Sequence, residues 1–314
     1  MIRKRTTAAA AGGIAVLLTL AACNGDGNGA DPGNGEGALD GADIIVGSKE
    51  FTEQRLLGQM TAALLEDAGA SVTDQTGLEG TATVRAALES GEIDIYWEYT
   101  GTGWVNILGN SPDPEEVPED LYTEVAAADE ENGIAWLEAA PFENTYRIAA
   151  AEDFAAEHGL ETSTDMADFV QANPDQGRIC AAAEFIARDD GLPGLEDAYG
   201  FEYSEVVEMA LDLIYTQVGE GCEFGEVFST DGRIVANDLR VLDDDEGFFV
   251  EYAGAVTLRQ ETLDEYPEIA EIMEAVSAEL TDEIMLDLNA RIDVDGEGER
   301  NVAEDWLTEN GFIG

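Results

Sequence analysis

The sequence predicts an α/β fold divided into two lobes. Short buried-strand patterns alternate with amphipathic helix patterns along the chain, which is typical of sheets with largely parallel strands. A second set of such patterns begins near residue 144. The ordered part spans about 270 residues, more than one hydrophobic core comfortably holds. We therefore expect two domains, each with its own sheet.

The first set of elements begins with the strand pattern DIIVG at residues 43–47. A helix follows over about 52–68, with apolar residues on one face, Thr52 as its N-cap and Glu53 in its first turn. The patterns then predict a strand near 71–75, a helix over 82–90, a strand at 93–99 and a helix around 121–132.

The second set begins with the strand pattern YRIAA at residues 146–150. It continues with helices near 151–158 and 165–172, the strand RICAA at 178–182, a helix over 204–213 and the strand GRIVAND at 232–238. The segment FFVEYAGAVTL at 248–258 then leads into three predicted C-terminal helices.

The first 22 residues have the pattern of an export signal. A basic stretch at residues 3–5 precedes an apolar run at 8–20 that is short for a membrane span. The run ends in LAAC, which resembles the lipobox of bacterial lipoproteins, with Cys23 as the acylated residue; an ordinary secretory signal is the alternative. Residues 23–42 are rich in Gly, Asn and Asp and are expected to form a flexible tether. We expect an extracytoplasmic protein that a lipid anchors to the cell membrane.

The chain is strongly acidic, with 14 basic residues against 69 acidic ones and a net charge of −55. Such a charge repels polyanions, which excludes nucleic acid as a partner. Apolar residues still make up 45% of the chain, so it is not a disordered acidic tail. High salt screens charge repulsion over a few ångströms, and the composition therefore indicates a halophilic protein.

Two cysteines remain after Cys23, and both lie in the second set of elements. In an oxidising compartment, Cys180 and Cys222 are expected to form a disulfide, with two buried free thiols as the alternative. The bridge would close a loop of about 42 residues and stabilise the fold by roughly 4 kcal/mol.

The sequence gives no support for catalysis. His158 is the single histidine, at an apparent helix end, and no serine lies in a nucleophile elbow. Residues 293–304, DVDGEGERNVAE, come close to a twelve-residue calcium loop, with acids at positions 1, 3 and 5 and glutamate at 12. In so acidic a chain that match also arises by chance, and calcium stays open. We expect no enzyme activity, no cofactor and no metal.

Lys49 is the one lysine outside the signal. It lies between a predicted strand end and a helix start, where open α/β sheets bind ligands and helix amides add positive potential. A lone ammonium group there would form a local anion site. The alternative is a solvated lysine.

Eight blocks of the sequence resemble the substrate-binding proteins of osmoprotectant ABC transporters, the glycine betaine, carnitine and choline family. They are VGSKEFTEQRLLGQM, GLEGT, IDIYWEYTGT, ENTYRIA, EFIARDDGLPGL, FSTDGRI, DDDEGFFVEYAGA and LNARIDVDG, in this order. The resemblance implies a type II-like periplasmic-binding-protein fold with two hinge crossings, near 142–146 and 248–252. Lobe I would comprise 43–143 plus 252–314, and lobe II 144–251.

The resemblance also implies a ligand site. An aromatic cage for a quaternary ammonium falls on Tyr99, Tyr146, Phe228 and Tyr252, and a carboxylate clamp on Lys49, Arg188 and Thr102. Without the resemblance, the tyrosines could be strand aromatics of the core and Arg188 a structural ion pair with Asp189 or Glu184. Two residues depart from the family pattern, Phe228 in place of tyrosine and Glu79 in place of glycine.

The resemblance implies a monomer that captures glycine betaine and delivers it to an ABC permease and its ATPase. Choline or carnitine is the alternative ligand, and a sensor lipoprotein without transport is the alternative function. Choline has no carboxylate and would leave Lys49 and Arg188 idle, so the two cations favour betaine.

Overall fold

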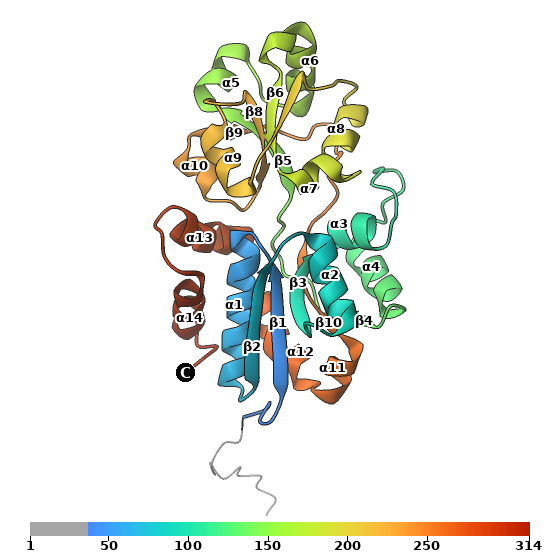
Figure 1. The fold of residues 1–314 in the computed structure, drawn as a ribbon, viewed down its shortest axis with the longest axis vertical. Coiled ribbons are helices and arrows are strands. Elements are labelled where there is room, and N and C mark those ends of the chain that lie inside the picture. The colour runs from blue at the N-terminus through green and yellow to red at the C-terminus, as the bar shows by residue number, and fades with distance from the viewer. Residues whose placement is uncertain (1–36) are drawn as a thin grey trace, which may run out of the picture. The chain divides into compact units, whose positions relative to one another are not determined.

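Two five-stranded mixed sheets with flanking helices make up the computed structural model, which describes residues 37–314 (Figure 1). The α/β prediction is confirmed. The predicted signal, the acylated Cys23 and most of the predicted tether lie outside the described residues. The folded chain begins before the expected boundary at residue 43, because Leu39 is buried and its amide donates to Ala68 O (2.9 Å).

The first sheet has the strand order β2-β1-β3-β10-β4. Its strands are β1 (Asp43–Lys49), β2 (Ser71–Leu78), β3 (Ile95–Tyr99), β4 (Ile134–Trp136) and β10 (Gly254–Arg259). Strand β1 runs parallel to β2 and β3, whereas β10 is antiparallel to β3 and β4. We call the part of the chain built around this sheet lobe I.

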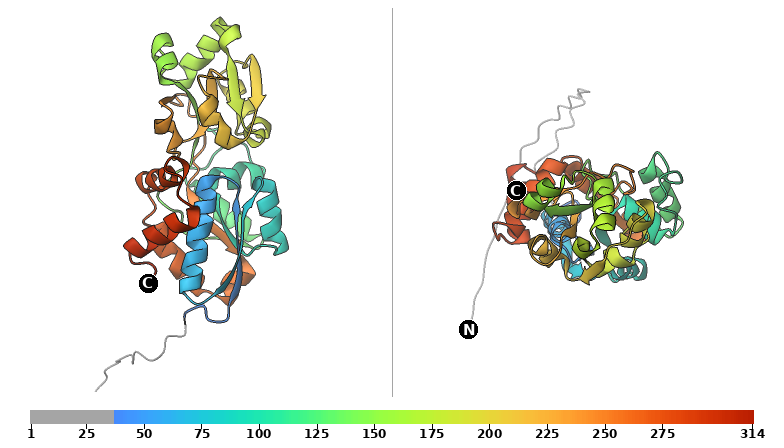
Figure 2. Two further views of the ribbon diagram at one scale, coloured as in Figure 1. Left: turned by 60° about the vertical axis from the view of Figure 1, so that its left-hand side comes forward. Right: turned by 90° about the horizontal axis from the view of Figure 1, so that it is seen from above.

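The helices of lobe I come from both ends of the chain. They are α1 (Thr52–Asp67), α2 (Thr81–Ser90), α3 (Thr100–Thr102), the π-helical turn η1 (Gly103–Ile107), α4 (Leu121–Glu130), α11 (Gln260–Glu265), α12 (Glu268–Ser277), α13 (Asp282–Asp293) and α14 (Glu299–Glu309). Figure 2 shows the C-terminal helices α13 and α14 against α1. The C-terminal segment therefore completes the lobe that the N-terminal segment begins.

The second sheet repeats this arrangement with the order β7-β6-β8-β5-β9. Its strands are β5 (Tyr146–Ala151), β6 (Arg178–Ala181), β7 (Glu205–Glu208), β8 (Phe224–Phe228) and β9 (Leu239–Val241). Its helices are α5 (Glu152–His158), α6 (Ser163–Ala172), the 3-10 turn η2 (Pro174–Gln176), α7 (Ala183–Ala187), α8 (Leu192–Ala198), α9 (Leu211–Gln217) and α10 (Arg233–Ala236). We call this part lobe II.

The chain passes between the two sheets twice, through residues 137–145 and 242–253. The two passages pair with each other through an antiparallel bridge between Glu143 and Ala253, and the Asn144 amide donates to Tyr252 O (3.1 Å). The lobe boundaries expected from the sequence fall within these passages.

The expected disulfide joins Cys180 of β6 to Cys222, just before β8. Both cysteines are buried in the core of lobe II with Ile214, Tyr215 and Val227. The bridge fixes the start of β8, the strand that carries Phe228.

Several predicted elements differ from the structure. The predicted helix over 204–213 is the strand β7 followed by α9, and the predicted strand over 232–238 contains the helix α10. Strands β4, β8 and β9 were not expected. Four helices rather than three follow β10, and each sheet has as many antiparallel as parallel pairs. Phe51 rather than Thr52 is the N-cap of α1, and Thr52 donates instead to Asp293 Oδ1 (2.7 Å).

None of the helices within residues 37–314 combines the length and the apolar character that crossing a bilayer requires.

His158 ends α5 as an exposed residue, with Gly159 in the left-handed conformation after it (φ 68°). This placement agrees with the helix end expected from the sequence.

Candidate functional site

A pocket between the two lobes brings together all seven residues that the sequence assigned to ligand binding. They are Lys49, Tyr99, Thr102, Tyr146, Arg188, Phe228 and Tyr252. The pocket contains about 510 Å³ of empty space, part of it open to solvent. Glu79 is exposed and does not line this pocket.

Strand ends position these residues. Lys49 and Tyr99 close the parallel strands β1 and β3, and Phe228 closes β8 directly opposite Tyr146, the first residue of β5. Ligand sites commonly form at the carboxyl ends of strands in open α/β sheets. Each lobe therefore presents the same kind of edge to the pocket.

The aromatic residues form one continuous wall. The ring centroid of Tyr146 lies 4.9 Å from that of Phe228 and 5.5 Å from that of Tyr252, with the latter pair edge to face. Phe51, which the sequence analysis missed, lies 5.2 Å from Phe228 and 6.3 Å from Tyr99. Its place within the motif VGSKEFTEQ was a signal that could have identified it. The wall presents π faces from both lobes.

The two tryptophans near Tyr99 do not belong to this wall. Trp97 is buried in the core of lobe I, where its indole N–H donates to Thr61 Oγ1 (3.0 Å). Trp104 is half-buried and donates to Ser111 O (2.9 Å).

Lys49 is a buried ion-pair partner, not a solvated lysine. Its Nζ lies 2.6 Å from Glu98 Oε1, with side-chain exposures of 5% and 0% for the two residues. Glu98 also accepts from the Tyr99 amide (2.8 Å) and the Tyr96 hydroxyl (2.9 Å). The ammonium group lies 5.4 Å from the centre of the Tyr99 ring, within cation–π range.

Asp190 fixes the orientation of the Arg188 side chain. Its Nε and one terminal nitrogen donate to the two carboxylate oxygens at 2.8 and 2.5 Å, a bidentate pair. The other terminal nitrogen donates to Glu184 (3.0 Å), and Thr102 Oγ1 accepts at 3.3 Å from the nitrogen that binds Asp190. The guanidinium group also lies 5.2 Å from the Tyr146 ring centre. Of the two partners considered in the sequence, Glu184 is found, and Asp189 is exposed.

Asp190 links the clamp to the aromatic wall. Its carboxylate accepts from the Tyr252 hydroxyl (2.6 Å) and from Asn106 (3.1 Å), in addition to Arg188. Burial raises the pKa of Asp190, but the hydrogen bonds and charge of Arg188 outweigh that effect and the pKa lies below its usual value. The carboxylate therefore stays ionised and orients Arg188.

Glu53, which the sequence placed only in the first turn of a helix, is buried and accepts four hydrogen bonds. One carboxylate oxygen accepts from the Tyr99 hydroxyl (2.7 Å) and Asn144 (2.5 Å), and the other from Thr230 (2.7 Å) and Asn289 (3.0 Å). Burial raises the pKa of Glu53, and the four hydrogen bonds oppose this rise without cancelling it. Because Thr230 belongs to lobe II, Glu53 ties the two lobes together beside the pocket.

Three carboxylic acids line the pocket, Glu50, Glu184 and Glu226, and the sequence analysis assigned none of them to the ligand site. Glu184 belongs to α7 and Glu226 to β8. Burial raises the pKa of Glu226 to about 8; the hydrogen bond from the Ala182 amide (2.8 Å) and the charge of Arg188 oppose this, while Glu184 adds to it. Near neutral pH, Glu226 is therefore mostly protonated, so an isolated charge is not buried there.

The segment 293–304, which nearly matches a calcium loop, forms ion pairs instead. Four of its five acids pair with arginines: Asp293 with Arg233 (3.6 Å), Glu297 with Arg291 (2.9 Å), Glu299 with Arg55 (2.8 Å) and Glu304 with Arg300 (2.6 Å). Within residues 37–314 there is no group of three or more His, Cys, Asp or Glu side chains placed to hold a metal ion. The geometry gives calcium no support.

The arrangement is suited to binding. Aromatic faces from both lobes lie beside two cations, each held by a buried carboxylate, while His158 and the disulfide lie elsewhere. A small molecule with a positively charged, poorly hydrated group would find π faces on one side and acidic and basic groups on the other.

Comparisons with known proteins agree with this geometry. Residues 42–309 match the family described as the substrate-binding domain of an ABC-type glycine betaine transport system. The chain is 36% identical over 278 residues to a glycine-betaine-binding protein of Pseudomonas aeruginosa, covering 86% of this chain and 88% of that protein.

Two other proteins are also similar. An ergothioneine transport permease and binding protein of Helicobacter pylori, EgtU, is 34% identical over 277 residues, covering 88% of this chain but only 49% of that longer protein. The solved structure of YehZ from Escherichia coli, titled as the apo form, aligns with a TM-score of 0.62 at 33% identity, covering 86% of this chain and 99% of that one.

Proposed function

We propose that this chain, which belongs to the family of substrate-binding domains of ABC-type glycine betaine transport systems, captures glycine betaine between its lobes. Membership of the family makes it a substrate-binding protein of a betaine, carnitine or choline ABC transporter, and not an enzyme. Such proteins bind a small ligand and deliver it to the permease of the transporter. The choice of betaine rests on the pocket.

The observation that carries the proposal is the aromatic wall beside Arg188 and Lys49. A trimethylammonium group cannot donate a hydrogen bond, so aromatic π faces are its best partners. Tyr146, Phe228 and Tyr252 supply such faces, and the ring centroid of Tyr146 lies 4.9 Å from that of Phe228 and 5.5 Å from that of Tyr252. The ligand carboxylate would lie toward Arg188, Lys49 and Thr102, where charged and hydroxyl donors meet.

The structure weakens one argument made from the sequence. Choline would not leave the two cations idle, because Lys49 already pairs with Glu98 and Arg188 with Asp190. The preference for betaine over choline therefore rests on the donors left at the pocket surface. Those donors are the second N–H of the Arg188 nitrogen that binds Glu184, and the hydroxyl of Thr102, which accepts from Arg188 and keeps its own hydrogen to donate.

A second ligand is favoured by Glu226. Glycine betaine has no hydrogen-bond donor to offer this carboxyl group, which lines the pocket wall. Ergothioneine, the ligand in the name of the H. pylori relative, combines a betaine group with a ring N–H that an acidic side chain can accept. It is the second candidate.

The test is calorimetric titration of residues 37–314 with glycine betaine, carnitine, choline and ergothioneine, in molar salt. We expect glycine betaine to bind with the lowest Kd of the four. Tighter binding of ergothioneine would instead assign Glu226 to the ring N–H and replace the proposal. Absence of binding by all four would contradict the whole assignment.

Removing one wall of the cage should weaken binding without abolishing it. We expect Tyr146→Ala to raise the Kd for glycine betaine about 5- to 30-fold, because a desolvated cation–π contact contributes about 1–2 kcal/mol. Tyr146→Phe keeps the π face and should stay within about threefold of wild type. Equal losses in both variants would show that the hydroxyl, not the ring, matters.

The cellular setting belongs to the same proposal. Cys23 carries a lipid that holds a monomer outside the cytoplasm, and residues between it and the folded lobes form the tether. The disulfide Cys180–Cys222 supports an oxidising compartment, and the acidic composition supports a halophilic source. Mass spectrometry of the membrane-bound protein would identify an acylated Cys23.

A further inference from the structure

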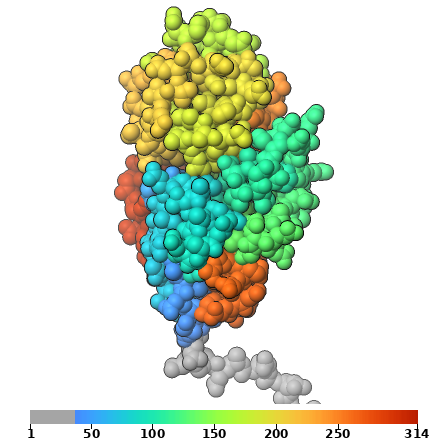
Figure 3. Space-filling model, turned by 45° about the vertical axis from the view of Figure 1, so that its right-hand side comes forward, coloured from blue at the N-terminus to red at the C-terminus, as the bar shows by residue number. Residues whose placement is uncertain are grey.

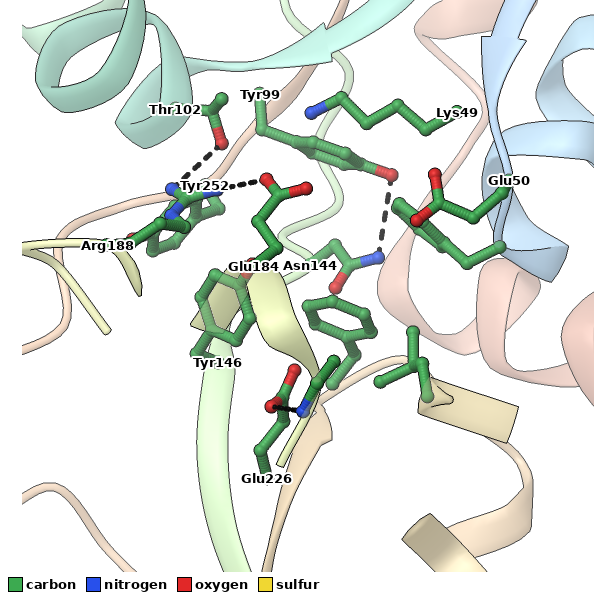
Figure 4. A pocket seen from close by; sticks show the side chains of 14 residues that line it. Lys49, Glu50, Tyr99, Thr102, Asn144, Tyr146, Glu184, Arg188, Glu226 and Tyr252 are labelled. Atoms are coloured by element: carbon green, nitrogen blue, oxygen red, sulfur yellow. Dashed lines mark hydrogen bonds and ion pairs between the residues drawn. The ribbon is translucent and has the colours of Figure 1, made fainter. Parts of the chain in front are cut away.

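Glu184 lies at the centre of the pocket and contacts both lobes. Figure 4 shows its carboxylate among the side chains of Arg188, Tyr99 and Tyr146. One oxygen accepts from the Thr81 hydroxyl (2.6 Å) and from Arg188 (3.0 Å), and the other from the Thr81 amide (3.2 Å). Thr81 begins α2 in lobe I, whereas Glu184 belongs to α7 in lobe II.

The surroundings keep this carboxylate charged. Burial raises the pKa of Glu184, but the charges of Lys49 and Arg188 and the hydrogen bonds from Thr81 outweigh burial, and the pKa lies below its usual value. A negative charge is therefore present in the pocket at neutral pH, within the group of cations and aromatic faces that the ligand would contact.

Arg188 has two carboxylate partners that differ in how firmly they are held. Asp190 has a side-chain exposure of 2%, accepts two hydrogen bonds from Arg188 and is fixed by Tyr252 and Asn106. The Glu184 side chain is 32% exposed and takes a single nitrogen of Arg188. Glu184 is thus the partner that a ligand can replace.

The nitrogen that Glu184 takes is also the one a ligand carboxylate needs. The Nε atom and the second terminal nitrogen of Arg188 point to Asp190, which leaves the remaining nitrogen to face the pocket. This terminal nitrogen keeps a second N–H, so a zwitterionic ligand that binds it brings its carboxylate next to Glu184 and is either repelled by that charge or displaces it. A ligand that carries only a positive charge leaves Glu184 in place and gains a nearby counter-charge.

We propose that Glu184 is the specificity-determining residue that sets how strongly this pocket distinguishes cationic from zwitterionic quaternary ammonium ligands. The inference rests on the proposed function, because it presumes a quaternary ammonium ligand. Glu184 favours choline, which keeps the carboxylate as a counter-charge, and opposes glycine betaine, whose own carboxylate competes for Arg188.

The contact with Thr81 gives the same residue a second effect that the test must separate. Figure 3 shows the segments of lobe II packed against the segments of lobe I that contain α2. Loss of the hydrogen bonds between Glu184 and Thr81 would ease separation of the lobes and would change the affinity for every ligand alike. The ratio of the Kd for choline to the Kd for glycine betaine is unaffected by such a general change, so this ratio isolates the effect of the Glu184 charge.

The experiment measures the Kd for choline and for glycine betaine by calorimetry, at one fixed salt concentration, in four proteins. These are wild type, Glu184→Gln, Thr81→Val and Glu79→Gln. Glu79→Gln removes the same charge from an exposed position close to Thr81 but outside the pocket. Thr81→Val keeps the charge of Glu184 and removes its 2.6 Å donor.

We expect Glu184→Gln to weaken choline binding and strengthen betaine binding, changing the ratio of the two Kd values at least tenfold. The ratio in Glu79→Gln and Thr81→Val should stay within about threefold of wild type. A Glu184→Gln ratio that matches wild type, or a Thr81→Val ratio that matches Glu184→Gln, overturns the inference alone. If wild type binds neither choline nor glycine betaine nor carnitine, the proposed function is overturned together with this inference.

Discussion

Glu226→Gln is expected to make the protein more stable than wild type by about 5 kcal/mol at pH 9, with no such gain at pH 4. The pKa of Glu226 is raised from 4.5 to about 8 in the folded protein, chiefly by burial. A group whose pKa is raised on folding contributes stability that is present below pH 4.5 and is lost as the pH rises through 8. Each pH unit between these values costs about 1.4 kcal/mol.

Glutamine is the suitable replacement because it keeps the oxygen that accepts from the Ala182 amide and never ionises. The measurement is urea unfolding of both proteins between pH 4 and 9, at constant salt. The difference in the free energy of unfolding should rise steadily with pH and level off above about pH 8. The same series with Glu79→Gln, at an exposed site, should show no comparable rise.

The same group should respond to ligand. A quaternary cation in the pocket favours the ionised form of Glu226, because an opposite charge nearby lowers the pKa of a carboxyl group. Glu226 is therefore both a source of instability at alkaline pH and a group that a cationic ligand stabilises. If the difference in stability between wild type and Glu226→Gln did not vary with pH, the pKa of Glu226 would not be raised in the folded protein. Both the instability at alkaline pH and the stabilisation by a cationic ligand would then be ruled out.

The long, strongly patterned elements of the fold could be predicted from the sequence. Helix α1 and strands β1 and β5 have buried faces that the periodicity of apolar residues indicates directly. Short elements were the ones that failed. The sequence GRIVAND contains two β-branched residues typical of strands, yet Val235 is 74% exposed in the four-residue helix α10. Tertiary contacts decide such segments, not their own propensity.

Strand β8 was missed for a different reason. Its sequence, FGEVF, places a glycine and the acidic Glu226 inside a strand that is buried along its whole length. A Cβ added at Gly225 would lie 2.4 Å from a Val218 side-chain atom, so close packing of α9 on the sheet requires glycine there. Neither residue type indicates a strand by itself.

The residues of the candidate site likewise divide into those that the sequence could indicate and those that it could not. Lys49 could be singled out because lysine is so rare in this chain, and the other six ligand residues came from motifs of a known family. Among 69 acidic residues, the sequence indicated Glu53 only as a first-turn acid and Glu184 only as an alternative ion partner of Arg188, and it did not single out Asp190 or Glu226. Only the fold shows which acids are buried and what they contact. Glu184 and Asp190 bind Arg188, Glu98 binds Lys49, and Glu53 accepts from uncharged side chains beside the pocket.

Asp129→Ala is expected to destabilise lobe I by about 3–5 kcal/mol. Arg85 of α2 donates to both oxygens of Asp129 at 2.6 Å, and the Trp136 indole donates to one of them at 2.8 Å. The side-chain exposures of Arg85 and Asp129 are 8% and 1%. Burial raises the pKa of Asp129, but Arg85 more than offsets it. Removing Asp129 leaves the buried Arg85 with a single carboxylate partner, the exposed Glu89 at 2.6 Å, in place of a buried bidentate pair, which accounts for the size of the loss.

The replacement of both partners separates this explanation from a simple loss of packing. Urea unfolding of Asp129→Leu, Arg85→Leu and the double variant should show the double variant to be more stable than either single one, because no buried charge is left without a partner. The pair Arg55–Glu299, with side-chain exposures of 35% and 29%, is the matched surface case, and Glu299→Ala should cost less than about 1 kcal/mol. If Asp129→Ala cost no more than Glu299→Ala, the pair would not hold α2 and α4 together, and the stability of lobe I would have to come from its apolar core alone.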